Sequence, residues 1–228
     1  MNKKFIILLI VFFLCSAGAT VFLFKDYFFS SKSQPTVEET WDFEKYLAIG
    51  YDQEQIDRLF AELSRLNSSL ENNPNDYNTL LKVGNIYMML EEYEKAEVVF
   101  LQIIEIEPSF APAHANLGEL YGSFWEEKSK AVDYYKKAIE LHPWRSQYYR
   151  SLADLYRSDF PEKKNEIESL ILSGIKEYPG NIDFYTYLAS YFTQENNIPK
   201  AIDYLEQALE IEPDNAVLKQ ELIELEGH

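Results

Sequence analysis

The chain has 228 residues, of which 38 are acidic and 21 are basic, so that its formal net charge is −17 at pH 7. This acidic balance disfavours nucleic-acid binding, because a protein that binds phosphates needs a basic surface. The single cysteine, Cys15, excludes an intramolecular disulfide and a metal cluster built from thiolates.

The first 29 residues are dominated by an apolar run. Phe5–Phe24 is a stretch of 20 uncharged, mostly apolar positions, which as a helix would span ~30 Å, the thickness of a bilayer core. The run predicts a signal-anchor in residues 1–29 that is retained as one transmembrane helix. Two alternatives stay open: secretion after cleavage at Ala19, which fits the small-residue rule of signal peptides, and a lipoprotein lipidated on Cys15.

Basic residues flank this run on both sides. The amino terminus, Lys3 and Lys4 precede it, whereas Lys25 and Lys32 follow it. Because positive charge favours the cytoplasmic side, the slight excess predicts a single-pass membrane protein with a cytoplasmic N-terminus. The rest of the chain would then be extracytoplasmic, and periplasmic if the source is a bacterium.

A polar linker and an amphipathic helix follow. Residues 30–51 contain serines and a proline and are predicted to be a linker with a short helix near its end. Residues 52–74 are predicted to form a helix, because apolar residues recur at helical spacing and Asp52 with Gln55 makes a capping pair. This helix would be part of a partial or degenerate repeat, since it ends on the first of a series of prolines.

The rest of the chain repeats with a period near 34 residues. Prolines recur 34 to 36 residues apart, at Pro74, Pro108, Pro143, Pro179 and Pro213. A fixed period of this length indicates a helical repeat array. When four units are aligned, the residue at their eighth position is always small: Gly84, Gly118, Ala153 and Ala189.

Other positions of the unit recur in the same way. Positions 4, 7, 8 and 11 are three or four residues apart and form one face of a first helix, helix A. Positions 20, 24 and 27 form the facing stripe of a second helix, helix B, which the proline ends. The small residue at position 8 is expected to let the two backbones approach closely.

These positions resemble the signature of the tetratricopeptide repeat family. The first unit matches it at Leu80, Val83, Gly84, Tyr87, Ala96, Phe100 and Pro108. The resemblance implies an all-α fold, a right-handed superhelical solenoid of helix-turn-helix repeats with a capping helix, to which the N-terminal transmembrane helix is added. The predicted repeats are residues 75–110, 111–145, 146–181 and 182–213, and the predicted capping helix is 214–228.

The second and third repeats have longer turns between their helices. One extra residue lies near Phe124 and Trp125, and two lie near Phe160 and Pro161. We predict that Trp125 and Phe160 form an aromatic partner-binding edge; the alternative is that the rings pack locally on helix B. The third repeat also departs from the pattern, with Ile167 at the small position 20 and Gly174 at position 27, so its helix B is expected to pack loosely or to be rotated.

Few residues are candidates for catalysis or for cofactor binding. The three histidines, His114, His142 and His228, form no metal-binding or catalytic motif, and the sequence has no glycine-rich phosphate loop. His114 occupies position 4, where a packing role is expected. We therefore predict that the protein is not an enzyme and uses no cofactor, metal ion or small-molecule substrate.

The resemblance also implies a binding surface, since helix-A positions 2, 5, 9, 12 and 13 line a concave groove in this family. The residues predicted to bind a partner there are Asn78, Leu81, Asn85, Met88, Met89, Glu119, Arg150, Asp154, Arg157, Asp183, Thr186 and Ser190. Of the carboxylate clamp found in chaperone-binding members, only Asn85 and Arg150 survive. Arg150 and Arg157 lie two helical turns apart on one stripe, and they suit either a partner's carboxylate or pairing with Asp154.

Together these features predict a membrane-anchored scaffold that mediates protein–protein interactions in an envelope-associated assembly. The alternative is a chaperone-like receptor for extended or translocating segments, of the kind that assists secretion or cytochrome maturation. Under both hypotheses the partners are other proteins, including basic or extended segments of them. The N-terminal helix would attach this protein to the membrane. A stoichiometric resident partner favours the scaffold, and transient binding of many peptides favours the receptor.

Overall fold

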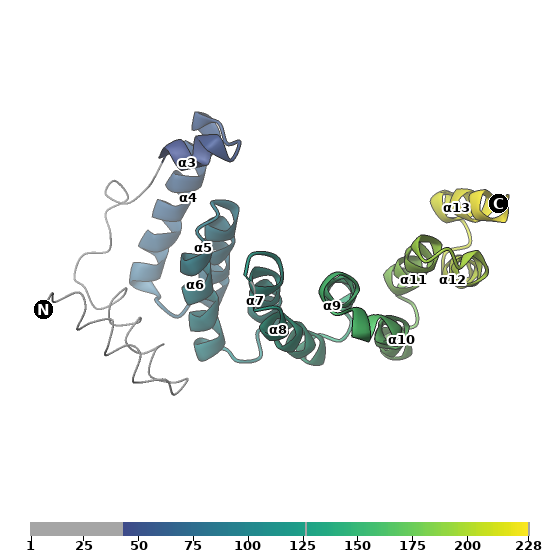
Figure 1. The fold of residues 1–228 in the computed structure, drawn as a ribbon. Coiled ribbons are helices and arrows are strands. Elements are labelled where there is room, and N and C mark those ends of the chain that lie inside the picture. Colours follow the sequence, from purple (N-terminus) through teal and green to yellow (C-terminus); the bar gives the residue numbers. More distant parts are fainter. Residues whose placement is uncertain (1–42, 126, 228) are drawn as a thin grey trace, which may run out of the picture. The chain divides into compact units, whose positions relative to one another are not determined.

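The computed structural model describes residues 43–125 and 127–227, and this part of the chain is built of helices (Figure 1). Its elements in chain order are α3 (Phe43–Ala48), α4 (Gln53–Asn72), α5 (Tyr77–Met89), α6 (Tyr93–Ile106), α7 (Ala111–Ser123), α8 (Lys128–Leu141), α9 (Ser146–Asp159), the 3₁₀ helix η1 (Pro161–Glu166), α10 (Ile167–Glu177), α11 (Ile182–Gln194), α12 (Ile198–Ile211) and α13 (Ala216–Glu226). The all-α class is confirmed for these residues. None of the described helices is both long and apolar enough to cross a membrane, and the apolar run of residues 5–24 lies outside the described part.

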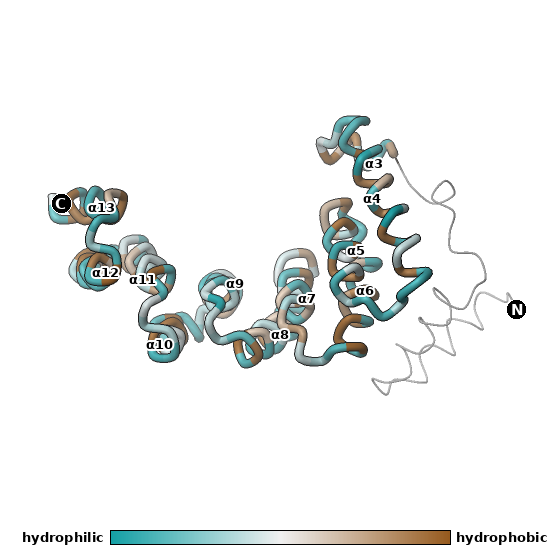
Figure 2. Tube along the Cα trace, turned by 180° about the vertical axis from the view of Figure 1, so that it is seen from behind, coloured by the Kyte–Doolittle hydropathy of each residue, from teal (hydrophilic) through white to brown (hydrophobic). Residues whose placement is uncertain are grey.

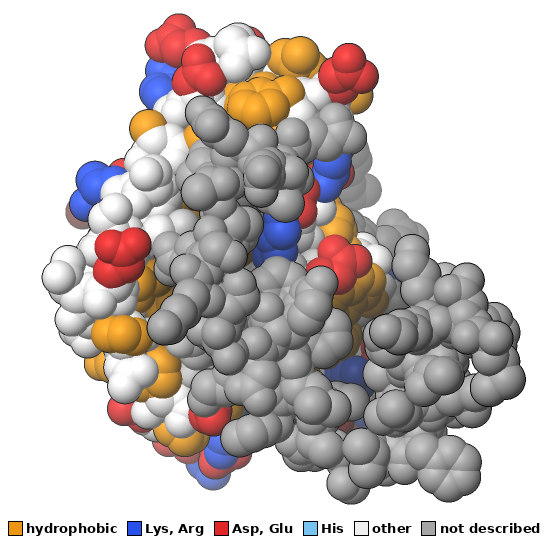
Figure 3. Space-filling view, turned by 90° about the vertical axis from the view of Figure 1, so that its left-hand side faces the viewer, with side chains coloured by type: hydrophobic (Ala, Val, Ile, Leu, Met, Phe, Trp, Pro, Cys, Tyr) orange, Lys and Arg blue, Asp and Glu red, His pale blue; other side chains and the backbone are white. Residues whose placement is uncertain are grey.

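The chain divides into two compact units, Met1–Ser64 and Arg65–His228. In the first unit Tyr46 of α3 is fully buried, and its ring centroid lies 5.8 Å from that of Phe60 on α4. The capping pair predicted at the start of α4 is confirmed: the Gln55 N–H donates to Asp52 Oδ1 at 2.7 Å, and the Asp52 N–H donates to Gln55 Oε1 at 2.8 Å. On the face that Figure 3 shows, the described acidic, basic and hydrophobic side chains are interspersed.

In the second unit helices pack in pairs along the chain, α5 with α6, α7 with α8 and α11 with α12. The four B helices end two residues before the repeat prolines, α6 at Ile106, α8 at Leu141, α10 at Glu177 and α12 at Ile211. A proline has no N–H for the next helical bond and restricts the residue before it, so the helix cannot continue. Hydrophilic and hydrophobic residues alternate along these helices (Figure 2), as expected of helices that bury one face.

The small residue at position 8 makes room for an aromatic ring of helix B. A Cβ atom added to Gly84 would lie 2.4 Å from the Phe100 ring, and one added to Gly118 would lie 2.8 Å from the Tyr135 ring. Both rings come from position 24 and are buried. This refines the interpretation from the sequence. Where position 8 is glycine, the aromatic ring at position 24 of helix B lies against the backbone of helix A, and a residue with a Cβ would displace that ring.

The third repeat differs from the others where the sequence departs from the pattern. Its longer turn folds into η1, and its helix B, α10, has 11 residues where α6, α8 and α12 each have 14. Ile167 is fully buried, and the space left by Gly174 is filled by the ring of Phe184 from the next repeat, 2.5 Å from where a Cβ would lie. Helix B of the third repeat is therefore closely packed at Ile167 and at Gly174.

The helix predicted at the C-terminus is α13, which packs against α12. Its N-cap residue is Asn215, whose side-chain oxygen accepts hydrogen bonds from the N–H groups of Val217 and Leu218. Leu218 and Leu225 are buried. The helix therefore covers apolar surface of the last repeat, as a terminal element of a repeat array must.

Candidate partner-binding site

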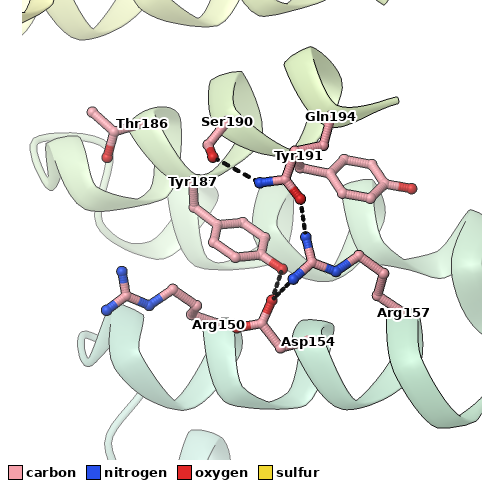
Figure 4. A pocket seen from close by; sticks show the side chains of 8 residues that line it. All are labelled: Arg150, Asp154, Arg157, Thr186, Tyr187, Ser190, Tyr191 and Gln194. Atoms are coloured by element: carbon pink, nitrogen blue, oxygen red, sulfur yellow. Dashed lines mark hydrogen bonds and ion pairs between the residues drawn. The ribbon is translucent and has the colours of Figure 1, made fainter. Parts of the chain in front are cut away.

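A polar hollow of about 260 Å³ lies between the A helices of the third and fourth repeats, α9 and α11 (Figure 4). It is lined by Arg150, Asp154, Arg157, Thr186, Tyr187, Ser190, Tyr191 and Gln194. Five of these were predicted from the sequence as groove residues: Arg150, Asp154, Arg157, Thr186 and Ser190. The structure brings these five together.

The two helices present their lining residues because of helical spacing. Arg150, Asp154 and Arg157 follow one another at intervals of four and three, so they share a stripe of α9. On α11 the spacing of four between Thr186 and Ser190 is continued by Gln194. The opposite faces of both helices are buried, with Leu152 and Leu188 fully inaccessible to solvent. The apolar faces therefore fix the rotation of the helices and leave these polar stripes facing each other.

A hydrogen-bonded network centred on Asp154 joins the two helices. The Tyr187 hydroxyl donates to Asp154 Oδ1 at 3.0 Å, and Arg157 Nη2 donates to the same oxygen at 3.1 Å. Arg157 Nη1 donates to Gln194 Oε1 at 2.5 Å, and Gln194 Nε2 donates to Ser190 Oγ at 3.2 Å (Figure 4). Arg157 is thereby committed to contacts within the protein.

The charge of Asp154 also acts on Tyr187. Burial raises the pKa of the Tyr187 hydroxyl, and the nearby Asp154 carboxylate and its hydrogen bond raise it further. The hydroxyl therefore stays protonated at physiological pH and remains a donor to Asp154. Neither Tyr187 nor Tyr191 was predicted, because they occupy positions 6 and 10, which are outside the groove positions of the family.

Arg150 differs from Arg157 in its partners. Its Nη2 donates to Gln147 Oε1 at 2.9 Å on the same helix, and it forms no ion pair with any described residue. Its side chain is exposed at the edge of the hollow, apart from the Asp154 network (Figure 4). Of the two alternatives left open for the arginines, pairing with Asp154 therefore holds for Arg157, and Arg150 remains available to a partner.

The other predicted groove residues lie outside this hollow. Asn85 accepts a hydrogen bond from Asn116 Nδ2 of the next repeat at 2.7 Å, and Asp183 accepts one from Ser146 Oγ at 2.8 Å. Both therefore join neighbouring repeats. The remaining members lie on α5 and α7: Asn78, Met89 and Glu119 are exposed, and Leu81 and Met88 are half-buried.

The Asn85–Asn116 and Asp154–Tyr187 hydrogen bonds join the same two positions of neighbouring repeats. Asn85 and Asp154 both occupy position 9, and their partners, Asn116 and Tyr187, both occupy position 6 of the following repeat. Position 9 thus contributes to the joint between A helices. A single sequence does not show this, because the partner residue differs at each joint.

The aromatic residues of the longer turns pack on the protein. The Trp125 ring lies edge-on to Tyr121 with centroids 5.0 Å apart, and Phe160 lies edge-on to Tyr156 at 6.3 Å. Tyr121 and Tyr156 belong to helix A, so these ring contacts are made with helix A, whereas the alternative considered from the sequence placed the rings on helix B. Both Trp125 and Phe160 remain half-exposed, and their predicted role as a binding edge stays a prediction.

His114 is a packing residue with one hydrogen bond. It is 7% exposed, and its Nε2 lies 2.9 Å from the carbonyl oxygen of Pro108. The Tyr185 hydroxyl, at the same position of the fourth repeat, donates to the Pro179 carbonyl at 3.0 Å. Because Nε2 must donate to that carbonyl, Nδ1 carries the lone pair in the neutral ring, and it has no hydrogen-bond partner.

This arrangement predicts sensitivity to acid. Burial lowers the pKa of His114, an effect that its bond to Pro108 only partly offsets. The unfolded chain therefore takes up a proton near pH 6.5 where the folded one does not, so the free energy of unfolding should fall as pH drops below that value. We expect His114→Gln to lose less stability than the parent between about pH 7.5 and 5.5 in thermal melts; equal losses would contradict the assignment.

Comparison with known proteins agrees with this architecture. A model of the tetratricopeptide repeat matches residues 77–110, 111–143 and 182–215. The chain contains tetratricopeptide repeats. The matches are three of the four predicted repeats, and the unmatched one, 146–181, is the repeat that contains η1 and the short α10. A search among curated proteins found no match.

Solved structures with the same fold are also found. The chain is similar to MamA, with 24% sequence identity and a TM-score of 0.54, over 73% of this chain and 98% of that one. It is similar to TTC0263 of Thermus thermophilus, with 17% identity and a TM-score of 0.53, over 80% and 97%. For pilF of Pseudomonas aeruginosa the values are 20% and 0.50, over 65% and 67%. At these identities the likeness shows the fold alone.

Proposed function

We propose that this protein is a membrane-anchored scaffold whose helix-A groove binds an extended segment of a partner protein at the hollow between α9 and α11. The observation that carries the proposal is the exposed Arg150 guanidinium, which has no carboxylate partner among the described residues although the chain carries 38 acidic residues. A tetratricopeptide repeat array sets the groove, and a few exposed side chains select the ligand.

The charge of the hollow indicates which group Arg150 binds. Two guanidinium groups and one carboxylate line it, so that its local charge is +1 within a chain of −17. An arginine fork matches a carboxylate in a bidentate way, and we propose an Asp or Glu side chain of the partner segment as its ligand. Repulsion between this carboxylate and the acidic residues elsewhere in the chain is largely screened beyond ~8 Å at physiological salt. The positive charge of the hollow therefore determines which group binds there.

The size and polarity of the hollow favour a peptide over a small molecule. Its volume of about 260 Å³ is below the usual range for drug-sized ligands, ~300–1,000 Å³, and it lacks the apolar walls of such sites. It suits one or two side chains of a longer segment that continues along the A helices. The exposed Met89 and Asn78 on α5 would offer further contacts to that segment.

The location is proposed from the sequence. The apolar run of residues 5–24 would hold the protein in a membrane, with the repeats on the extracytoplasmic side because Lys3 and Lys4 precede the run. In this position the repeats would hold a partner within an envelope-associated assembly. Retention of the full-length chain in membrane pellets after carbonate and high-salt washes tests this part of the proposal, and an N-terminus beginning at Thr20 would contradict it.

Charge reversal at Arg150 tests the binding site. The partner is first identified by crosslinking in native membranes, and its affinity is then compared for Arg150→Glu and for Lys136→Glu, a matched reversal at an exposed site on α8. Because a hydrogen bond to a charged group contributes about 1.5–3 kcal/mol, we expect Arg150→Glu to weaken binding by about 10- to 100-fold and Lys136→Glu to leave it nearly unchanged. Equal affinities of the two variants would exclude the hollow, whereas weak capture of many unrelated peptides would favour the receptor.

A further inference from the structure

Repeats three and four are joined by hydrogen bonds and ion pairs at several levels. On the groove side, the Asp154 oxygen that accepts from Tyr187 and the bond from Arg157 to Gln194 link α9 to α11, as described above. At the start of the same helices Ser146 Oγ donates to Asp183 Oδ2 at 2.8 Å. These contacts lie at the beginning, the middle and the end of α9.

The turns and the B helices of the same two repeats are joined as well. Lys164 of η1 forms an ion pair with Glu195 at 2.6 Å. On the B helices, Glu168 of α10 accepts from Lys200 Nζ at 2.6 Å and from the Tyr204 hydroxyl at 2.8 Å, both on α12. Each exposed pair alone stabilises little, but because hydrogen bonds are directional, bonds at this many separate places fix the orientation of one repeat on the other.

The joint between repeats two and three is of another kind. Its polar contacts among the described residues are an ion pair from Lys128 to Asp159 at 3.7 Å, a bond from Asn181 Nδ2 to the Trp144 carbonyl at 3.3 Å, and a hydrogen bond between the side chains of Ser151 and Tyr135. Trp144 lies two positions before the start of α9, and Asn181 is the N-cap residue of α11. Their bond therefore joins the starts of α9 and α11 and does not hold α9 to α8. What remains is apolar packing around Tyr148, to which Ala111, Ala115, Ala138, Ile139 and Leu141 contribute.

Among the described residues, the joint between repeats one and two has fewer polar contacts than the joint between repeats three and four, but they are short. Repeats one and two share the Asn85–Asn116 bond of 2.7 Å, the hydrogen bond from Tyr121 to Glu97, and stacked rings of Tyr93 and Phe124 with centroids 4.0 Å apart. The bond of 3.3 Å and the ion pair of 3.7 Å at the joint between repeats two and three are therefore longer than the 2.7 Å bond at the first joint and the bonds of 2.5–3.0 Å between α9 and α11.

We infer that repeats three and four move as one rigid body and that the array bends at the joint between repeats two and three. Apolar contacts are non-directional, so packed helices can slide over one another at small cost, which is the shear type of motion. Bonds of 2.5–3.0 Å between α9 and α11 oppose the same motion. The hollow lies wholly within the rigid body, so its geometry persists while Glu119 and the first two repeats change their position relative to it.

Distance measurements between equivalent positions of helix B test this inference without a ligand. Lys136, Leu172 and Glu206 occupy the same position of α8, α10 and α12, and all three are exposed. Nitroxide labels are attached to cysteines at 136 and 172, or at 172 and 206, in the full chain carrying Cys15→Ser. We expect a broader distance distribution for the pair 136/172 than for the pair 172/206. Equal widths, or a broader distribution for 172/206, would overturn the inference.

Removal of the directional contacts tests their role. Asp154→Ala with Glu168→Ala removes the acceptors that Tyr187 of α11 and Lys200 and Tyr204 of α12 meet across the joint. We expect the 172/206 distribution to broaden toward that of 136/172, while circular dichroism reports unchanged helix content. Tyr187→Phe, which removes a single hydroxyl, should give a smaller broadening in the same direction. Widths that do not respond to either variant would overturn the assignment of rigidity to these bonds.

Discussion

Gly118→Leu is expected to lower the free energy of unfolding by about 3 kcal/mol or more. A Cβ alone at this position would lie 2.8 Å from the ring of Tyr135, and the remaining leucine atoms would have to enter the same space. Since Tyr135 is buried, its ring cannot move into solvent without giving up its own packing. Chemical denaturation followed by circular dichroism measures the loss, and in a one-dimensional array the neighbouring repeats should melt with the second.

A matched control and a compensating change make this prediction specific. Gly180→Ala adds a Cβ where no other atom lies within 4 Å, so it should change stability by no more than about 0.5 kcal/mol. Combining Gly118→Ala with Tyr135→Leu should recover part of the loss that Gly118→Ala causes alone, because the smaller side chain leaves room for the methyl group. If Gly118→Leu melts with the parent, the proposed facing of helices A and B in the second repeat is wrong.

Phe184→Ala is expected to destabilise the protein by about 3–5 kcal/mol, the range for removing a buried aromatic side chain. Phe184 is 1% exposed. Its ring occupies the space over Gly174 of the preceding repeat and lies edge-on to Tyr149, with centroids 5.1 Å apart. The substitution therefore opens a cavity at the joint between repeats three and four.

The same denaturation experiment distinguishes this cavity from a general loss of apolar side chains. Val217→Ala removes two methyl groups from a residue that is 73% exposed and should stay within about 0.5 kcal/mol of the parent. Phe184→Leu should lie between the parent and Phe184→Ala. A loss below about 1 kcal/mol for Phe184→Ala would show that the ring does not fill the joint as described.

Much of the helical architecture could be predicted because it rests on local chemistry. A proline ends the helix before it whatever the rest of the chain does, so the spacing of Pro108, Pro143, Pro179 and Pro213 placed the ends of the B helices. The capping pair of Asp52 and Gln55 is local for the same reason. Periodic small and large residues then placed the buried faces, because each helix must cover its apolar stripe.

The partners of individual side chains could not be predicted in the same way. Periodicity placed Arg150, Asp154 and Arg157 on one stripe of α9, but it did not tell which arginine pairs with Asp154. That depends on Tyr187 and Gln194 of the next repeat, which reach across from α11. The hydrogen bonds between A helices of neighbouring repeats join residues 31 to 37 positions apart, and no local rule specifies them.

The third repeat illustrates a second limit. Two extra residues near Phe160 indicated a longer turn, but not that it would fold into a 3₁₀ helix and shorten helix B. The loose packing expected from Gly174 is replaced by contact with Phe184, which belongs to another repeat. A glycine in an alignment shows that space is left, and only the assembled structure shows which side chain fills it.

Site-specific photocrosslinking from the hollow tests whether a partner protein binds there through Arg150. A photoreactive amino acid is placed at Thr186, which lines the hollow, or at Glu206, which is exposed on α12, in the full-length protein in its native membranes. We expect a defined crosslink to one partner protein from position 186, its loss when Arg150→Glu is added, and no such product from position 206. A product from position 186 that is indifferent to Arg150→Glu, or the same partner captured only from position 206, would contradict binding at the hollow through Arg150.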